Sequence, residues 1–332
     1  MDVSLTLEAG VILAVIVAVS VWIDLFCHRK AKEVTFKDAA IWSCVWIALA
    51  LSFYAYLFLR HSPQQASLFL SGYVLEKALS IDNMMVFVAI FGSFNIKGIL
   101  QHRILYFGII GALLFRAIFV AAGTWIFGIS HWVEAVFAAI VLWTGVKMFM
   151  GSEEGDESED YSHHWSVRLT SRIMPVIPRM VGHHFVVGRK HAEEVAQKEG
   201  FSLPKRAAMY ATPMLLCLMC IEISDIIFSF DSVPAIIAVT KEPFLVYASV
   251  IFAILGLRNL YFMLSAAAKY LAHLEKAVAL VLVFIAAKLA GSAFGLFDIN
   301  HLVSLAVVLG LILGGVIISL IFPGEKEEEQ QG

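Results

Sequence analysis

Long apolar runs recur along the 332-residue chain, each close to the length of a membrane-crossing helix. A helix needs roughly 20 apolar residues to cross the hydrocarbon core, whereas a barrel strand needs only about ten in strict alternation. The pattern therefore predicts an all-α polytopic membrane protein with about nine transmembrane helices. The predicted spans are residues 7–27, 39–59, 67–92, 104–127, 131–150, 211–239, 244–266, 276–296 and 301–322.

Composition agrees with this pattern. Apolar residues make up 60% of the chain and charged residues 15%, whereas soluble domains average about 45–50% and 25%. The first run begins with acidic residues and has no small-residue cleavage site, so we expect a retained span and not a signal peptide.

Lysine and arginine are distributed unequally between the two sides that these spans define. Outside the spans or at the first residue of a span, 17 fall on the side of the C-terminus and only two, Arg60 and Lys241, on the opposite side. Because basic loops stay in the cytoplasm, the N-terminus is predicted outside and the C-terminus inside.

Charged residues inside the predicted spans are the main candidates for function. Each costs roughly 2.5–3.5 kcal/mol at the centre of a bilayer, so they must face one another or a wet cavity. Six acids stand against five bases, and a bound cation or proton would balance the remaining negative charge. Spans 3–8 contain Glu76, Lys77, Asp82, Arg116, Glu134, Lys147, Glu222, Asp225, Asp231, Arg258 and Lys288.

The acids recur in a repeated spacing. Asp225 and Asp231 are six residues apart, as are Glu76 and Asp82, and a small polar residue follows each second acid. The basic residues continue the match: GALLFR pairs with AILGLR, and TGVKM with IAAKL, which aligns Arg116 with Arg258 and Lys147 with Lys288.

Spans 3–5 and 6–8 are therefore predicted to be two copies of one three-helix unit. An odd number of spans places the copies in opposite orientations, which is the inverted repeat found in many secondary transporters. The predicted parts are two N-terminal helices (1–66), repeat 1 (67–150), a cytoplasmic loop (151–206), repeat 2 (207–296) and a last helix with an acidic tail (297–332).

Oxygen ligands dominate the candidate metal site. Carboxylates, an amide and a hydroxyl suit Mn²⁺, Mg²⁺ or Ca²⁺, whereas Zn²⁺ and Cu⁺ prefer histidine or cysteine. Pro234 predicts a helix break at residues 231–234 that would turn Asp231 toward a cavity. The candidate ligands are Glu76, Asp82, Asn83, Glu222, Asp225, Asp231 and Ser232.

The five basic residues of the spans are predicted to balance these charges, either as buried salt bridges or beside the ion. The set is Lys77, Arg116, Arg258, Lys147 and Lys288. Lys77 would neutralise Glu76 or Asp82 when no ion is bound, and Lys147 could instead extend from a helix end toward water. Glu134 is an exit-side carboxylate or a structural one.

The remaining polar features have simpler interpretations. Cys217 and Cys220 lie in an apolar span and are read as small apolar residues. The loop 151–206 begins with an acidic run and holds five of the eleven histidines, which favours a cytoplasmic domain or a solvated linker over metal sensing. We find no nucleotide-binding loop and no catalytic constellation, so neither an enzyme nor an organic cofactor is expected.

The motifs EKALSIDN (76–83) and EISDIIFSFDSVPAI (222–236) resemble the paired signatures of the TerC/Alx family of bacterial membrane proteins. SVWIDL, YATPM and FAILGLRNLYFML extend the resemblance over nearly the whole chain. The resemblance implies a nine-span inner-membrane protein related to LysE-type exporters, with Mn²⁺ export in Alx-like members and tellurite resistance in TerC. The loop near 190–205 is longer than in the Alx pattern. A regulatory role of the loop in Alx-like members therefore cannot be carried over directly to this chain.

Three functions remain open at this point. The first is a Mn²⁺ exporter that alternates access and exchanges the ion for protons. The second is a non-transporting factor that stabilises or metallates envelope proteins, and the third is a transporter of another cation such as Ca²⁺. The expected partners are a divalent metal ion and the lipid bilayer, with a homo-oligomer or envelope proteins left open and no nucleic acid.

Overall fold

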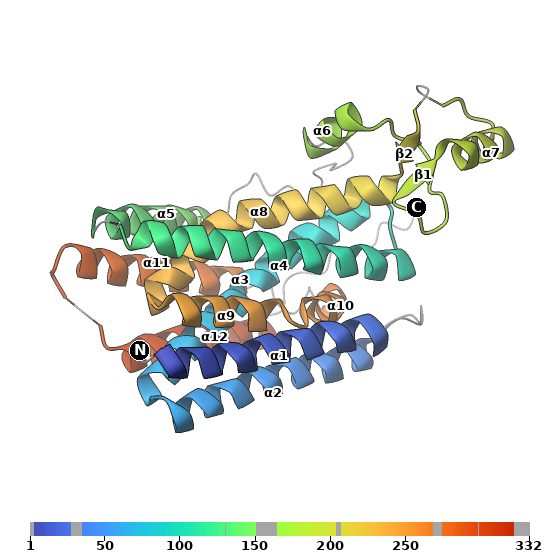
Figure 1. The fold of residues 1–332 in the computed structure, drawn as a ribbon. Coiled ribbons are helices and arrows are strands. Elements are labelled where there is room, and N and C mark those ends of the chain that lie inside the picture. The colour runs from blue at the N-terminus through green and yellow to red at the C-terminus, as the bar shows by residue number, and fades with distance from the viewer. Residues whose placement is uncertain are drawn as a thin grey trace. The chain divides into compact units, whose positions relative to one another are not determined.

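The computed structural model describes residues 3–27, 35–129, 131–150, 165–203, 207–267, 274–297 and 299–321. The acidic run 153–160, His163, His164 and the tail 322–332 lie outside the described residues. Apart from a small two-stranded sheet, the described elements are helices (Figure 1). They are α1 (Val3–Cys27), α2 (Phe36–Arg60), α3 (Pro63–Ser93), α4 (Ile99–Phe127), α5 (His131–Phe149), α6 (Trp165–Ile173), β1 (Val186–Gly188), α7 (Arg189–Glu199), β2 (Met209–Ala211), α8 (Pro213–Thr240), α9 (Pro243–Ile254), α10 (Leu257–Ala267), α11 (Leu274–Ala293) and α12 (His301–Ile321).

Helices occur at each of the nine predicted positions, with α9 and α10 together at the seventh. Within the described residues, six helices are long and apolar enough to cross a membrane, and the bent pair α9–α10 makes up to seven. The other two positions hold α1 and α3, and α3 carries three charged residues in its middle. The all-α polytopic class is confirmed, and the count of nine stays a prediction.

The chain divides into two compact units, and α3, α4 and α8 contribute residues to both. Unit 1 contains residues 1–84, 113–153 and 228–332, and unit 2 contains residues 85–112 and 154–227.

Unit 1 has an aromatic core at its N-terminal helices. Phe53 of α2, Phe69 of α3 and Phe252 of α9 contact one another, with ring centroids 4.9–5.5 Å apart. Leu13 of α1 packs into the same cluster, and α1 and α2 lie side by side in Figure 1. The outward faces of these helices are apolar, for example at Val15 and Leu59. Such faces would be unfavourable in water and are the surface expected against lipid tails.

Also in unit 1, α5 and α11 pack along each other. Gly145 of α5 allows a close approach, because a Cβ there would lie 3.0–3.1 Å from Leu282 and Val283 of α11. These are the third helices of the two predicted repeats. The inverted repeat itself remains a prediction.

Unit 2 includes the folded part of the loop. Strands β1 and β2 pair antiparallel, with Val187 opposite Tyr210. Tyr210 and Val187 share a small apolar core with Ile177, Val181 and Ala192. The described part of the predicted loop is therefore a small folded region and not a solvated linker.

The predicted break in the sixth span is wrong, since α8 runs from Pro213 to Thr240 with Pro234 inside it. Proline removes one helical hydrogen bond, but the residues from Ala235 to Val239 are all buried. Packing around this turn accounts for the continuous helix.

The seventh span is broken instead. Helices α9 and α10 meet at a bend of 48°. Leu255 is extended, with ψ of 124°, and Gly256 has φ of +82°. A side chain at Gly256 would also overlap the ring of Trp46 in α2. The mid-span glycine of AILGLR was the sequence signal for this break.

Candidate functional site

Glu76 and Arg116 form a buried ion pair in unit 1, between α3 and α4. The residues are 0% and 1% exposed. A charge in such surroundings must be paired, because an isolated buried ion is strongly destabilising. Arg116 and Glu76 are therefore paired with each other, and the wider charge-balancing role remains a prediction.

Lys77, the next residue of α3, contacts a different feature of unit 1. Its Nζ donates to the carbonyl oxygens of Ala253 at 3.0 Å and Leu255 at 3.4 Å. These carbonyls belong to the C-terminal end of α9, where the helix leaves backbone acceptors without intrahelical partners. A positive charge is also favourable at that end of the helix dipole. In the structure, the ammonium of Lys77 therefore stabilises the broken seventh span.

Glu222 and Asp225 lie one turn apart on α8 within unit 2, as their spacing predicts. Asp225 is 4% exposed. The carboxylate of Glu222 lies directly against Gly111 of α4, where any side chain would overlap it. Its Oε2 is buried and has no hydrogen-bond partner among the described residues. Such an acceptor is suited to receive a proton or a cation.

The structure describes the side chains of only some of the other predicted ligands. Asn83 is buried on α3, and Ser232 is buried on α8, where its Oγ has no hydrogen-bond partner in the described part of the chain. Asp82 and Asp231 lie on the same two helices, but their side chains lie outside the description. Among the described side chains, no three of histidine, cysteine, aspartate or glutamate gather closely enough to hold a metal.

Two further buried polar residues, each close in sequence to a predicted site residue, were missed by sequence reasoning. Ser80 lies on α3 two residues before Asp82, and Asn259 follows Arg258 on α10. Neither the Ser80 Oγ nor the Asn259 Nδ2 has a hydrogen-bond partner within the described residues. The Arg-Asn pair inside an apolar run was the available signal for Asn259.

The remaining basic residues have unequal environments. Lys288 of α11 is buried, and its Nζ donates to the Ser304 Oγ of α12 at 3.3 Å. Arg258 is also buried, at the start of α10. Lys147 is instead exposed in the last turn of α5, as expected for a lysine that extends to water. The repeat therefore aligns Lys147 and Lys288 in sequence but not in environment.

Glu134 is held by a cation at the end of its span. The Nζ of Lys241 donates to the Glu134 Oε2 at 2.9 Å and to the Ser292 Oγ at 3.2 Å. This contact joins α5, α11 and the residue after α8 within unit 1. It supports a structural role for Glu134.

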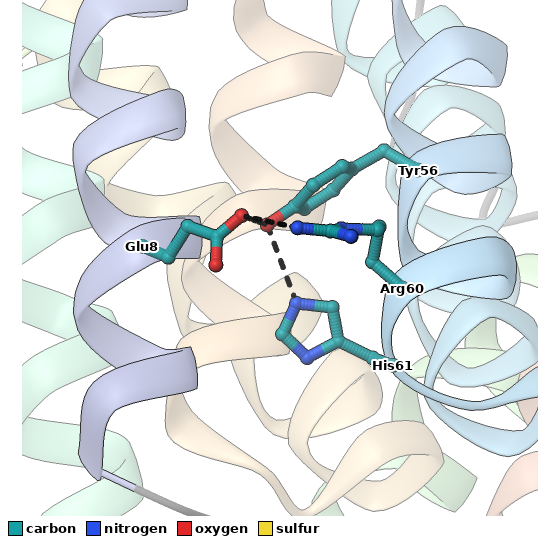
Figure 2. Close-up of polar contacts among 4 residues, drawn as sticks. All are labelled: Glu8, Tyr56, Arg60 and His61. Carbon is teal, nitrogen blue, oxygen red and sulfur yellow. Dashed lines mark hydrogen bonds and ion pairs between the residues drawn. The ribbon is translucent and has the colours of Figure 1, made fainter.

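Arg60, the second basic residue predicted on the outer side, is paired in the same way. It lies 3.7 Å from the Glu8 carboxylate, which also accepts a 3.3 Å hydrogen bond from the Tyr56 hydroxyl (Figure 2). The His61 Nε2 lies 3.4 Å from that hydroxyl. This cluster is exposed to a large extent, since the Arg60 side chain is 67% exposed.

Apolar helices of membrane-spanning length with buried charged residues define an integral multi-pass membrane protein. Comparison with known proteins gives its family. The model of the integral membrane protein TerC family matches residues 61–328, and the chain belongs to this family.

Two relatives illustrate the similarity. The chain is 47% identical over 323 residues to the tellurium resistance protein TerC of Serratia marcescens, covering 94% of this chain and 93% of the relative. It is 36% identical over 332 residues to Alx of Escherichia coli (strain K12), named as a candidate membrane-bound redox modulator, covering 96% of each. No solved structure matches the chain.

Proposed function

We propose that the protein exports Mn²⁺ across the bacterial inner membrane by alternating access, with protons as the exchanged ion. In this proposal the carboxylates of α3 and α8 bind the ion, with Asp82, Asp225 and Asp231 as main ligands. Asn83 and Ser232 add neutral oxygens, and Glu76 and Glu222 bind the ion or carry protons. The N-terminus would lie outside and the C-terminus in the cytoplasm.

The observation that carries the proposal is the acid pair on α8. Glu222 and Asp225 stand one turn apart on an apolar helix, and the Glu222 Oε2 is buried without a hydrogen-bond partner among the described residues. Acids at membrane depth are energetically costly, and those that occur typically mark ion or proton paths. The relatives are named for tellurium resistance and redox modulation, so the choice of ion rests on oxygen ligands and on the family resemblance.

Net Mn²⁺ flux into proteoliposomes, read by a lumenal metal-quenched dye, tests this proposal. We expect Asp225→Asn to lower the flux by at least about ten- to a hundred-fold, because changing even the outer-shell partners of metal ligands typically costs that much. Asp38→Asn makes the same chemical change at an exposed residue of α2, and should leave the flux unchanged.

Competing divalent cations test which ion is the substrate, and a lumenal pH dye tests whether transport is coupled to protons. If protons are exchanged, Mn²⁺ entry should raise the lumenal pH, and excess Ca²⁺ or Mg²⁺ should compete weakly. Absence of flux from folded wild-type protein would overturn the proposal in favour of a non-transporting factor. Full flux in Asp225→Asn would overturn the site assignment.

A further inference from the structure

Helix α6 of unit 2 presents apolar side chains outward and small polar ones inward. Leu169 and Ile173 are 46% and 79% exposed, and Trp165, one turn earlier, is 51% exposed. Ser166 and Thr170 are buried instead. A helix on a water-exposed surface shows the opposite arrangement, with its apolar stripe against the protein. Residues at intervals of four lie on one helix face, so the three exposed side chains form a continuous stripe.

Two arginines flank this stripe. Arg168 and Arg172 are exposed and lie one turn apart, beside Leu169 and Ile173. An exposed apolar stripe with basic residues along its edge is typical of helices that lie in the plane of a membrane interface. At nine residues, α6 is too short to cross a bilayer.

The point at which α6 contacts α8 agrees with a location of α6 at the bilayer interface. The Ser166 Oγ lies 3.0 Å from the Cys220 Sγ of α8. Cys220 comes seven residues after Pro213, the first residue of this candidate span, which is about 10 Å along a helix axis. A 28-residue helix is long enough to cross the hydrocarbon core and both headgroup regions, so this depth falls near the boundary between headgroups and acyl chains.

We propose that α6 is an interfacial helix that binds the anionic lipid surface of the bilayer. Leu169, Ile173 and Trp165 enter the acyl boundary, and Arg168 and Arg172 pair with headgroup phosphates. Tryptophan is enriched at this depth in membrane proteins, and each basic residue near an anionic surface adds to the attraction. The binding tethers the folded part of the loop to the membrane whichever ion the protein carries.

A nitroxide label at Leu169→Cys, in the full-length protein in lipid vesicles, tests this proposal. The native cysteines are replaced, with Cys220→Ser retaining a hydroxyl near Ser166. Collision of the label with oxygen, which concentrates in lipid, is compared with collision with a water-soluble nickel chelate. The matched control is Gln197→Cys, at an exposed position of α7 in the same region.

The expected result is oxygen-dominated collision at position 169 and nickel-dominated collision at position 197. Adding Arg168→Gln and Arg172→Gln should move the label toward water in vesicles that contain phosphatidylglycerol. Equal access of nickel at both positions would overturn membrane binding. A label shielded from both reagents would also overturn it, because a protein surface would then cover the stripe. A depth that is independent of phosphatidylglycerol and of the arginines would overturn the role of anionic lipid.

Discussion

Arg116→Met is expected to lower the free energy of unfolding by about 3–5 kcal/mol, because it leaves the Glu76 carboxylate buried without its counter-ion. The structure pairs these two side chains within unit 1, and both residues are at most 1% exposed. The loss can be measured by titration with SDS in mixed micelles.

The chain supplies a matched control in its exposed Glu8–Arg60 pair (Figure 2). Because exposed ion pairs contribute only about 0–1 kcal/mol, Arg60→Met should cause a much smaller loss. Adding Glu76→Gln to Arg116→Met removes both buried charges and should recover most of the stability. If Arg116→Met were no more destabilising than Arg60→Met, the buried pair would not be a structural element.

Lys77→Met is the second change with a large expected effect. It keeps an unbranched side chain of similar length but removes the ammonium that binds the Ala253 and Leu255 carbonyls. Because an unsatisfied buried acceptor costs about 1–3 kcal/mol, losing both contacts should cost roughly 2–6 kcal/mol. In lipid no water can replace the missing donor.

Lys147→Met is the control for this prediction. Lys147 is exposed in the last turn of α5, so its replacement should change the stability by less than about 0.5 kcal/mol. The same SDS titration compares the two variants. Equal stability of Lys77→Met and Lys147→Met would show that the end of α9 does not need the ammonium.

The positions of the helices could be predicted from the sequence because lipid imposes a simple length rule on apolar runs. The rule does not locate breaks within a span. Pro234 suggested one, but close packing keeps α8 continuous, whereas the break occurs at Gly256, where a positive φ and the contact with Trp46 both require glycine. Both outcomes depend on tertiary neighbours that hydropathy does not report.

The burial of most charged residues of the spans could be predicted from the sequence, but the partner of each could not. The cost of charge in lipid predicted that the charged residues of the spans would be buried against partners. It did not predict that Glu76 binds Arg116 while Lys77 turns to the end of α9. Neighbouring residues on a helix point about 100° apart, so each contact depends on how the helix is rotated in its unit.

Direct binding of Mn²⁺ to the purified protein tests the central claim, that the carboxylates of α3 and α8 bind a divalent cation. Free aqueous Mn²⁺ gives a strong paramagnetic resonance signal that is lost on binding. Wild-type protein and Asp38→Asn should bind Mn²⁺ saturably, whereas Asp82→Asn and Asp225→Asn should not. No saturable binding by the wild type, or equal binding by Asp225→Asn, would contradict the claim.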